Sequence, residues 1–368
     1  MKIRGHSPDY IFILCVILLT VFGLVMLSSA SSDLGKQKFN DTFYYLKHQL
    51  IYGLSFGIIG FLITSYFYYR KFERIALLLL ILNIVALILV FTPLGFSHSN
   101  AARWLDLGFF SFQPAEFLKF TFIIYLAAWL SNKKNNRQTS FLGGLLPFLI
   151  ICGAVAFLVF KQPATTTVLI VLASALLIYF ISGARLSFIV GTILLGVLVL
   201  TALIFTSTDS YRYKRVMNFF NPENADVQVE GFHRNQALMA IGSGGFWGVG
   251  LGQSTTKFKH LPEPIGDSIF AVIAEELGFV GAVALIVAFA TLLVRGFFIA
   301  KNSQDQFAKL TAVGLTSVIA IQIFVHIAAI SGLTPLTGVP LPFISYGGTA
   351  LAIFLTMSGV IVNISKYT

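Results

Sequence analysis

Residues 10–27 read YIFILCVILLTVFGLVML and contain no charged side chain. A helix crosses the roughly 30 Å hydrocarbon core of a bilayer with about 20 mostly apolar residues, so this run predicts a membrane-spanning helix. A cleavable signal peptide is the alternative, because Lys2 and Arg4 precede the run and residues 28–30, Ser-Ser-Ala, resemble a cleavage site. The apolar run is longer than such peptides usually carry, which favours an uncleaved span.

The rest of the chain has the same apolar character. Its 368 residues are 57% hydrophobic and only 11% charged, and the mean hydropathy is +0.85. This balance excludes soluble, disordered and collagen-like proteins. Cys15 and Cys152 both fall in apolar stretches, and the 6 histidines are scattered without ligand spacing. Neither a disulfide framework nor a metal site built from these residues is expected.

Similar apolar runs recur along the chain and predict ten membrane-spanning helices. They lie near residues 9–30, 46–67, 75–92, 114–130, 143–160, 165–183, 186–206, 268–298, 308–331 and 343–364. The run at 268–298 is long for one crossing, so nine or eleven spans would also fit; tilt or a partly exposed start is the simpler explanation. The predicted fold is all-α, a single polytopic membrane domain over residues 1–368 without internal repeats.

The distribution of basic residues predicts the orientation, because cytoplasmic connections carry an excess of Lys and Arg. With the N-terminus in the cytoplasm, the inner connections hold Lys2, Arg4, Arg70, Lys71, Arg74, Lys133, Lys134, Arg137, Arg185, Arg295, Lys301, Lys309 and Lys366. The short outer connections hold only Lys36, Lys38, Arg103 and Lys161. Both termini are therefore expected in the cytoplasm.

One long connection, residues 207–266, separates the seventh and eighth predicted spans and is expected outside the cytoplasm. It holds six further basic residues, which are Arg212, Lys214, Arg215, Arg234, Lys257 and Lys259, while Lys47 and Lys119 lie just inside spans. Prolines, acidic residues and the glycine-rich run at 242–252 distinguish it from the spans, which indicates a functional loop rather than a second domain. The glycine spacing matches no nucleotide-binding motif. A tightly turned or re-entrant backbone is expected there, with Phe246 and Trp247 as interfacial anchors.

Charged side chains within the spans need a partner or a function. Pro114 opens the fourth span, and Glu116 and Lys119 follow it three residues apart, on one helical face. Ionised groups in lipid face the interior of the bundle and are functional by default. A plain salt bridge that fixes packing is the alternative. Further along, Gln322 and His326 lie one turn apart and are expected to form a hydrogen-bonded pair.

Asp267 opens the eighth span, directly after the sequence LPEPIG. An N-cap is one interpretation, because Asp is a favoured capping residue. A general base is the other, since a carboxylate between water and an apolar bundle can have a raised pKa. Glu275 lies on nearly the same face two turns further in. The uncharged, Pro- and Gly-rich stretch 331–348 lies between the last two spans and is expected to form a wall of some site.

Five ordered motifs resemble the SEDS family of bacterial cell-wall polymerases, the proteins of shape, elongation, division and sporulation. They are RWLDLG at 103–108 running into FQPAEFLK at 112–119, QALMAIGSGGFWGVGLGQS at 236–254, LPEP at 261–264 with Asp267, FAVIAEELG at 270–278 and PLPFISYGG at 340–348. Within the family, the glycine-rich run and the last motif resemble the cell-division branch more than the elongation branch.

This resemblance implies a peptidoglycan glycosyltransferase in the bacterial cytoplasmic membrane that polymerises lipid II at its outer face, with a class B penicillin-binding protein as transpeptidase partner and a septal role in division. It implies that Asp267 is the essential aspartate, supported by Glu263, Glu275, Glu276 and Ser345. Two departures from the family pattern concern the surroundings of the site. Ile265-Gly266 replaces a common His-Thr, and Gln162-Pro163-Ala164 replaces a frequent Gln-Pro-Asp.

The implied reaction is inverting glycosyl transfer, in which a sugar hydroxyl attacks a lipid-linked anomeric carbon and polyprenyl diphosphate leaves. Asp267 is expected to act as general base. The residues expected to bind the substrate or stabilise the departing diphosphate are Arg103, Glu116, Lys119, Arg212, Lys214 and Arg215. A divalent cation, Mg²⁺ or Mn²⁺, is a further expectation. A lipid II flippase and a non-catalytic division scaffold are the alternative functions, and no interaction with nucleic acid is expected.

Overall fold

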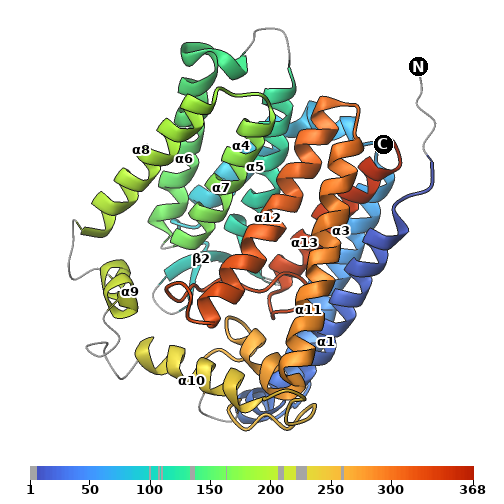
Figure 1. The fold of residues 1–368 in the computed structure, drawn as a ribbon, viewed down its shortest axis with the longest axis vertical. Helices are drawn as coiled ribbons and strands as arrows, with labels where there is room; N and C mark the ends of the chain where they lie inside the picture. The colour runs from blue at the N-terminus through green and yellow to red at the C-terminus, as the bar shows by residue number, and fades with distance from the viewer. Residues whose placement is uncertain are drawn as a thin grey trace.

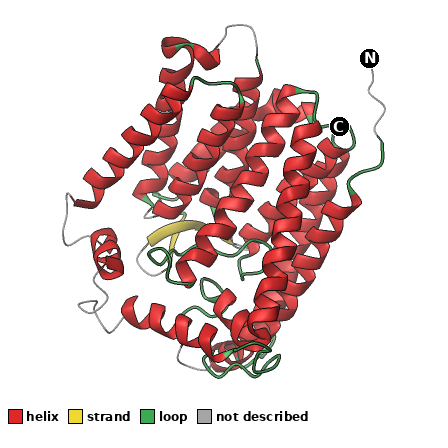
Figure 2. Ribbon diagram, in the orientation of Figure 1, coloured by secondary structure: helices red, strands yellow, loops and turns green. Residues whose placement is uncertain are grey.

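The computed structural model describes residues 6–98, 101–106, 108, 111–132, 137–162, 164–205, 211–220, 230–257 and 261–368. The described chain is mostly helical, and its long helices run side by side as one bundle (Figure 1). A small sheet and several loops lie toward the end of the bundle that is remote from both termini (Figure 2).

The helical elements, in chain order, are α1 (Tyr10–Phe39), α2 (Tyr44–His48), the π-helical η1 (Gln49–Leu54), α3 (Ser55–Tyr66), α4 (Arg70–Leu89), α5 (Pro114–Ser131), the short η3 (Arg137–Thr139), the π-helical η4 (Phe141–Leu145), α6 (Leu146–Lys161), α7 (Thr165–Ile181), α8 (Leu186–Phe205), α9 (Tyr211–Phe220), α10 (Glu230–Ser243), α11 (Ile269–Asn302), α12 (Gln306–Ile330) and α13 (Gly348–Ser365). The strands are β1 (Gly95–His98), β2 (Ala101–Asp106) and β3 (Ser111–Phe112).

A helix or a continuous run of helical segments lies over each of the ten predicted spans. Within the described residues, 7 of these are long and apolar enough to cross a membrane: Tyr10–Phe39, Tyr44–Tyr66, Arg70–Leu89, Phe141–Lys161, Ile269–Asn302, Gln306–Ile330 and Gly348–Ser365. Helices α7 and α8 are also apolar, but their apolar helical stretches, Thr165–Ile181 and Leu186–Ala202, are shorter. The chain is therefore a multi-pass membrane protein, as its composition predicts.

Helix α11 is broken at Gly278, whose φ of 68° and ψ of −168° are not helical. The turns before the break are buried, from Ile269 to Glu276. The expectation of a partly exposed start was therefore wrong, and the tilt of the helix stays a prediction. The excess length of this run is a short helical segment embedded in protein, followed by the lipid-facing remainder.

The three-stranded sheet was not predicted from the sequence. It is antiparallel in the order β1-β2-β3, with Gly95 opposite Leu105 and Leu105 opposite Phe112. Strand β3 leads directly into α5, where Gln113 is the N-cap and Pro114 occupies the first turn, a position at which its missing N–H costs no helical hydrogen bond. The sheet thus holds Arg103, on β2, beside the start of the α5 span.

The two ends of the chain lie together. The His6 amide donates to the Lys366 carbonyl over 2.8 Å, and Arg295, in the last part of α11, pairs with Asp9. Arg70 pairs with Asp305 over 3.0 Å at this same end of the bundle. Asp267 lies at the opposite end of α11, so the bundle has a terminal end and a loop end.

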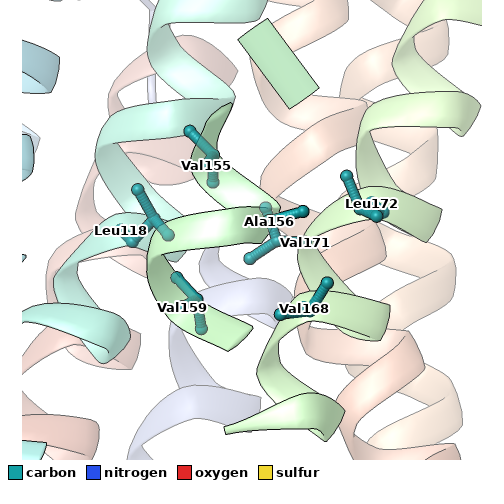
Figure 3. Close-up of a pocket in the computed structure, with 7 residues that line it drawn as sticks. All are labelled: Leu118, Val155, Ala156, Val159, Val168, Val171 and Leu172. Carbon is teal, nitrogen blue, oxygen red and sulfur yellow. The ribbon is translucent and has the colours of Figure 1, made fainter. Parts of the chain in front are cut away.

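The interior of the bundle is mostly apolar. A small hollow between α5, α6 and α7 is lined only by Leu118, Val155, Ala156, Val159, Val168, Val171 and Leu172 (Figure 3). It is too small to hold a water molecule and offers no polar group, so it is a packing gap rather than a binding site.

Candidate functional site

Asp267 lies immediately before α11 but does not cap it. The N-cap residue is Ser268, and its side chain makes no capping hydrogen bond. The capping interpretation of Asp267 was therefore wrong. Asp267 does not cap the helix because of the shape of the turn before it. The amides of Gly266 and Ser268 both donate to the Glu263 carbonyl over 3.1 Å. These bonds close the turn and leave the half-buried Asp267 side chain outside the hydrogen-bond ladder of the helix.

The loop before α13, residues 331–347, holds this turn in place from the other side. Ser345 Oγ donates to the Gly266 carbonyl and accepts from the Leu341 amide, both over 2.8 Å. The Tyr346 amide donates to the Ile265 carbonyl over 2.8 Å. Ile265 and Gly266, which replace the common His-Thr pair, thus accept these two hydrogen bonds through their carbonyl groups. Ser345 therefore connects the loop before α13 to the turn that carries Asp267.

Gly338, in the same loop, lies against the carboxylate. A Cβ atom built on Gly338 would be 3.3 Å from Asp267 Oδ2, so this loop approaches the side chain with its bare backbone. A residue other than glycine would place a methyl group or more at the carboxylate.

Burial and three charged groups act on the Asp267 carboxyl. Burial, together with the neighbouring Glu263, raises its pKa from 3.8 to about 7, and Arg215 and Arg103 oppose this rise. A carboxyl with a pKa near 7 is divided between its two protonation states at neutral pH, which is the condition under which a general base works best. The structure therefore brings together three of the residues that sequence reasoning placed in the site, Asp267, Arg103 and Arg215, with Glu263 beside them.

Arg103 is held by the bundle rather than by the loop. Its Nε donates to the Gln162 carbonyl over 3.0 Å, and Gln162 Nε2 donates to the Leu87 carbonyl over 3.0 Å. These bonds connect β2 to the ends of α6 and α4. Arg215 comes from α9, and the side chains of Arg212 and Lys214 on that helix lie outside the described part of the structure, as does Pro163.

His233, on α10, is a site residue that sequence reasoning missed. Its Nε2 lies 2.6 Å from Ser268 Oγ, and Ser268 Oγ donates to the Pro262 carbonyl over 2.8 Å. Because the hydroxyl proton is used there, Nε2 of His233 is the donor. Burial and the nearby Arg215 lower the pKa of His233 to about 4, so the ring is neutral at pH 7. Nothing in the scattered histidine spacing signalled this contact between distant segments.

Glu116 and Lys119 form an ion pair with an N–O distance of 2.6 Å, with the Lys119 side chain 0% exposed. Lys119 also donates to Gln322 Oε1 over 2.6 Å, and Gln322 Nε2 donates to the Pro340 carbonyl over 2.8 Å. The pair therefore connects α5 and α12 to the loop that approaches Asp267. Its complete burial favours a positioning role over direct binding of a diphosphate.

His326 does not pair with Gln322, contrary to expectation. Its Nδ1 lies 2.8 Å from the Val339 carbonyl, one residue from the carbonyl that Gln322 binds. Both side chains turn toward the irregular backbone of the loop, because carbonyls there lack the helical partners that a span would provide.

Glu275 and Glu276 fix the segment between the glycine-rich run and Asp267. Glu275 accepts from Ser254 Oγ over 2.5 Å and from the Thr255 amide over 3.0 Å, and it also accepts from the Thr256 hydroxyl. Glu276 pairs with Lys257 over 2.7 Å. Both acids therefore support the loop rather than the reacting centre, and Lys257 is a partner that the sequence alone did not indicate.

The glycine-rich run completes the broken helix. The Phe279 amide, which lost its helical partner at the break, donates to the Gly245 carbonyl over 2.9 Å. In return, the Gly250 amide donates to the Glu276 carbonyl over 3.0 Å. The run is tightly turned, as expected, and Trp247 is 77% exposed. Its glycines serve close backbone contact rather than phosphate binding.

Within the described residues, no group of three or more His, Cys, Asp or Glu side chains is arranged to hold a metal ion. Asp267 and Glu263 act on one another electrostatically. Two carboxylates combined with substrate phosphates are a donor set that Mg²⁺ accepts.

Comparison with known proteins places these features in a family. The model of the cell cycle proteins FtsW, RodA and SpoVE matches residues 9–368. The chain is 37% identical to stage V sporulation protein E of Bacillus subtilis, over 100% of both chains. It is 38% identical to a probable peptidoglycan glycosyltransferase FtsW of Trichlorobacter lovleyi, over 98% of this chain and 94% of the relative.

Two solved structures share the fold. One, described as a peptidoglycan synthase complex that coordinates polymerization and crosslinking, matches with a TM-score of 0.78 at 24% identity over 98% of both chains. The rod shape determining protein RodA of Thermus thermophilus matches with a TM-score of 0.71 at 22% identity over 98% of both chains. Since the family match and the relatives above 30% identity span nearly the whole length, the chain belongs to the FtsW, RodA and SpoVE family of cell cycle proteins.

Proposed function

We propose that this protein is a peptidoglycan glycosyltransferase that polymerises lipid II. The observation that carries the proposal is the half-buried Asp267 carboxyl at the loop end of the bundle, with a pKa of about 7 that the charges of Arg103 and Arg215 lower and burial raises. A base and two cations at one point suit a reaction that removes a proton from a hydroxyl and releases a diphosphate. The names of the relatives, among them a probable peptidoglycan glycosyltransferase, support the same reaction.

In the proposed step, the sugar hydroxyl oxygen forms a bond to the anomeric carbon of a second, lipid-linked sugar from the face opposite the diphosphate. Asp267 takes the hydroxyl proton, and the bond between the anomeric carbon and the diphosphate oxygen breaks with its electron pair on the oxygen. The configuration at the anomeric carbon inverts. General base catalysis of this kind typically contributes about 10²–10⁴-fold.

The leaving diphosphate gathers negative charge, which Arg103 and Arg215 would stabilise. Arg103 is pre-oriented by its bond to the Gln162 carbonyl, so it needs little reorganisation during the reaction. Glu263 and the diphosphate oxygens would hold a divalent cation such as Mg²⁺ or Mn²⁺, which would neutralise part of the developing charge and leave the Asp267 carboxylate free to take the proton.

The proposed topology has ten spans, with both termini in the cytoplasm and residues 207–266 outside. Asp267 lies at the end of the bundle remote from the termini, which hold together through the His6 and Lys366 backbone. The basic residues of the terminal end support a cytoplasmic location for it. Lipid II polymerisation would then occur at the outer face of the cytoplasmic membrane.

The proposed cellular role is septal cell-wall synthesis, in partnership with a class B penicillin-binding protein that cross-links the strands. Identities of 38% to an FtsW and 37% to a sporulation protein support a division or sporulation role over rod elongation. The partnership is supported by the structural likeness to a complex whose description joins polymerization to crosslinking.

The test is polymerisation of labelled lipid II by the purified protein in proteoliposomes, with and without a class B penicillin-binding protein. Glycan strands should form with the native chain and be lost in Asp267→Asn, which keeps the size of the side chain. Asp41→Asn is the matched control, because Asp41 is an acid of the same end that pairs with Lys47 away from the site.

Full polymerisation by a well-folded Asp267→Asn variant would remove the proposed base. Transfer of lipid II across the vesicle membrane without polymer would instead support the flippase alternative, and partner binding without either activity would support the scaffold.

A further inference from the structure

A groove lies between α1 and the start of the second span, away from Asp267. Its cavity volume is about 630 Å³, within the range of about 300–1,000 Å³ that is usual for ligand sites. On α1 it extends from Val21 to Ser32, roughly 17 Å at 1.5 Å per residue. The other residues that line it are Leu24, Val25, Ser28, Ser29, Thr42, Phe43, Leu46, Leu50, Leu251, Gly252 and Lys257.

The lining changes from apolar to polar along the groove. On α1, Val21 and Val25 are followed by the hydroxyls of Ser28 and Ser32. Lys36 continues the same helical face four residues further and is exposed. The opposite wall changes in the same sense, from leucines in the second span to Thr42 before it. The groove thus has a hydrocarbon part and a hydroxyl-lined part that ends at an ammonium group.

Both walls are membrane spans, so the apolar part faces the hydrocarbon of the bilayer. Val21 is 53% exposed and Val25 45% exposed in the isolated chain. In a membrane, the hydrocarbon chains of lipids cover such surface without burying unsatisfied polar groups. The occupant therefore has an acyl chain or a similar chain.

The charges at the polar end indicate an anionic headgroup. Lys257 lies at the floor of the groove but is neutralised by Glu276, and Asp41 is paired with Lys47. The two exposed lysines at the end of α1, Lys36 and Lys38, outnumber the single acid there, Asp33. The rim therefore has an excess of positive charge.

We propose that this groove is a resident phospholipid site, which holds one acyl chain of an anionic phospholipid with its phosphate at the rim formed by Ser32 and Lys36. The lipid is structural rather than reacting, because Asp267 is not among the residues that line the groove. Helix α2 lies between the two sites. Its Leu46 lines the groove, and the Nδ1 atom of His48 is hydrogen-bonded to the Tyr346 hydroxyl over 2.9 Å. The bound lipid would hold α2 against Tyr346, whose amide binds the Ile265 carbonyl beside Asp267.

Photo-cross-linking in nanodiscs tests the site. The full chain is placed in phosphatidylethanolamine nanodiscs that contain a trace of phosphatidylglycerol with a diazirine on one acyl chain. After irradiation, labelled peptides are mapped by mass spectrometry. Residues 21–32 and 42–50 should be labelled about tenfold more than a lipid-facing stretch of α11 around Val287, the ratio expected for a preference of about 1.4 kcal/mol.

Val25→Trp fills the groove and should abolish the excess labelling, and Leu24→Phe provides a second, milder filling variant. Val287→Trp is the matched control, since Val287 is 57% exposed on α11 and does not line this groove. Lys36→Ala should remove the preference for the phosphatidylglycerol probe over a phosphatidylcholine probe. Size-exclusion chromatography establishes that each variant is folded.

Even labelling of all lipid-facing helices, or labelling unchanged in both folded groove-filling variants, would overturn the site. Loss of the label on addition of excess polyprenyl phosphate would identify a prenyl lipid as the occupant and overturn the assignment to a phospholipid. The proposal is independent of the proposed reaction, because Asp267→Asn, which should stop polymerisation, should leave the labelling unchanged.

Discussion

At the scale of single residues, the properties of Asp267 come from its neighbours rather than from its position in a motif. Burial removes water from the carboxylate and disfavours its charged form, while the two arginines favour it. The balance leaves the pKa at about 7. An aspartate in water, with a pKa near 3.9, would be fully ionised at neutral pH and a much weaker base.

This balance predicts the pH dependence of polymerisation. Because the reacting form of Asp267 is the carboxylate, kcat/KM should rise with pH and level off above a midpoint near the pKa of about 7. Below the midpoint the rate should fall about tenfold for each pH unit, as for a single titrating base. The measurement is the initial rate of lipid II polymerisation between pH 5 and 9, values that are about two units on either side of the midpoint.

Variants of the charged neighbours should move the midpoint in opposite directions. Arg103→Gln removes a cation that lowers the pKa of Asp267, so the midpoint should move to higher pH. Glu263→Gln removes an anion that raises it, so the midpoint should move to lower pH. Asp41→Asn should leave it in place. A midpoint that stays fixed in both neighbour variants would mean that another group titrates.

At the scale of elements, two segments distant in sequence complete one another. The break at Gly278 releases backbone groups of α11, and the glycine-rich run supplies their partners. Close approach requires glycine on both sides. A Cβ on Gly248 would be 2.2 Å from the Glu276 carbonyl oxygen, and a Cβ on Gly278 would be 2.3 Å from the Gly248 amide nitrogen.

Gly248→Ala should therefore destabilise the protein by about 1–3 kcal/mol or more, the usual cost of forced overpacking. Its φ of +84° adds strain for a residue with a Cβ. Gly242→Ala is the control within the same run, because a Cβ there meets nothing within 4 Å. Thermal unfolding of both purified variants in detergent provides the comparison, and equal midpoints would contradict the interlocking of loop and helix.

The ion pair of α5 offers a second test at this scale. Lys119→Met leaves Glu116 charged and buried without its partner, which should cost about 3–5 kcal/mol of stability. Glu116→Gln should also lower the stability and the polymerisation rate. If the pair only positions the loop, exchanging the two residues should restore part of both the thermal midpoint and the polymerisation rate.

A folded but wholly inactive exchange variant would indicate instead that Lys119 acts on the substrate directly. The two readouts must be measured on the same preparation, because loss of activity alone does not separate the two roles.

At the scale of the whole molecule, the bundle separates a terminal end from a loop end. Arg295 and Asp9 pair at the terminal end. Asp267 lies immediately before α11, which begins at the other end of the bundle, beside irregular loops (Figure 1). If the terminal end is cytoplasmic, every part of the candidate site faces outward.

This arrangement predicts which cysteines a membrane-impermeant maleimide can reach in intact cells. With Cys15 and Cys152 replaced by serine, Asn40→Cys at the end of α1 should be labelled in intact spheroplasts. Asn302→Cys at the end of α11 should be labelled only after permeabilisation. Both positions are exposed, so accessibility depends only on the side of the membrane. The reverse pattern would invert the proposed orientation.

Much of the fold could be read from local composition. Runs such as residues 10–27 and 308–331 coincide with helices because crossing a bilayer imposes length and hydrophobicity on each span separately. The sheet that holds Arg103 could not be predicted, since its short strands pair across a turn and have little pattern of their own. The break at Gly278 was missed for a related reason: a single glycine in an apolar run does not reveal that another segment will replace the lost hydrogen bonds.

The candidate site divides in the same way. The type and order of the residues indicated Asp267, Ser345 and the loop before the last span, because charged or proline-rich segments at a membrane need a reason to be there. His233, Lys257 and the bonds from Gln322 to the loop depend on side chains that meet across many residues of sequence. Hydrophobic periodicity along the chain does not predict such contacts between distant segments.

The amino-acid sequence by itself determined that this is a helical protein of the membrane, with one carboxylate at the entrance of a span and a buried pair of opposite charges. The hydrophobic length of a span and the cost of charge in lipid depend on each segment alone, so both can be predicted from the local sequence. Only the tertiary structure decided that Asp267 does not cap α11. It also decided that the pKa of Asp267 is shifted and that the charges of two arginines act on it. Those properties depend on distances between segments, and electrostatic and hydrogen-bond energies change steeply over a few ångströms.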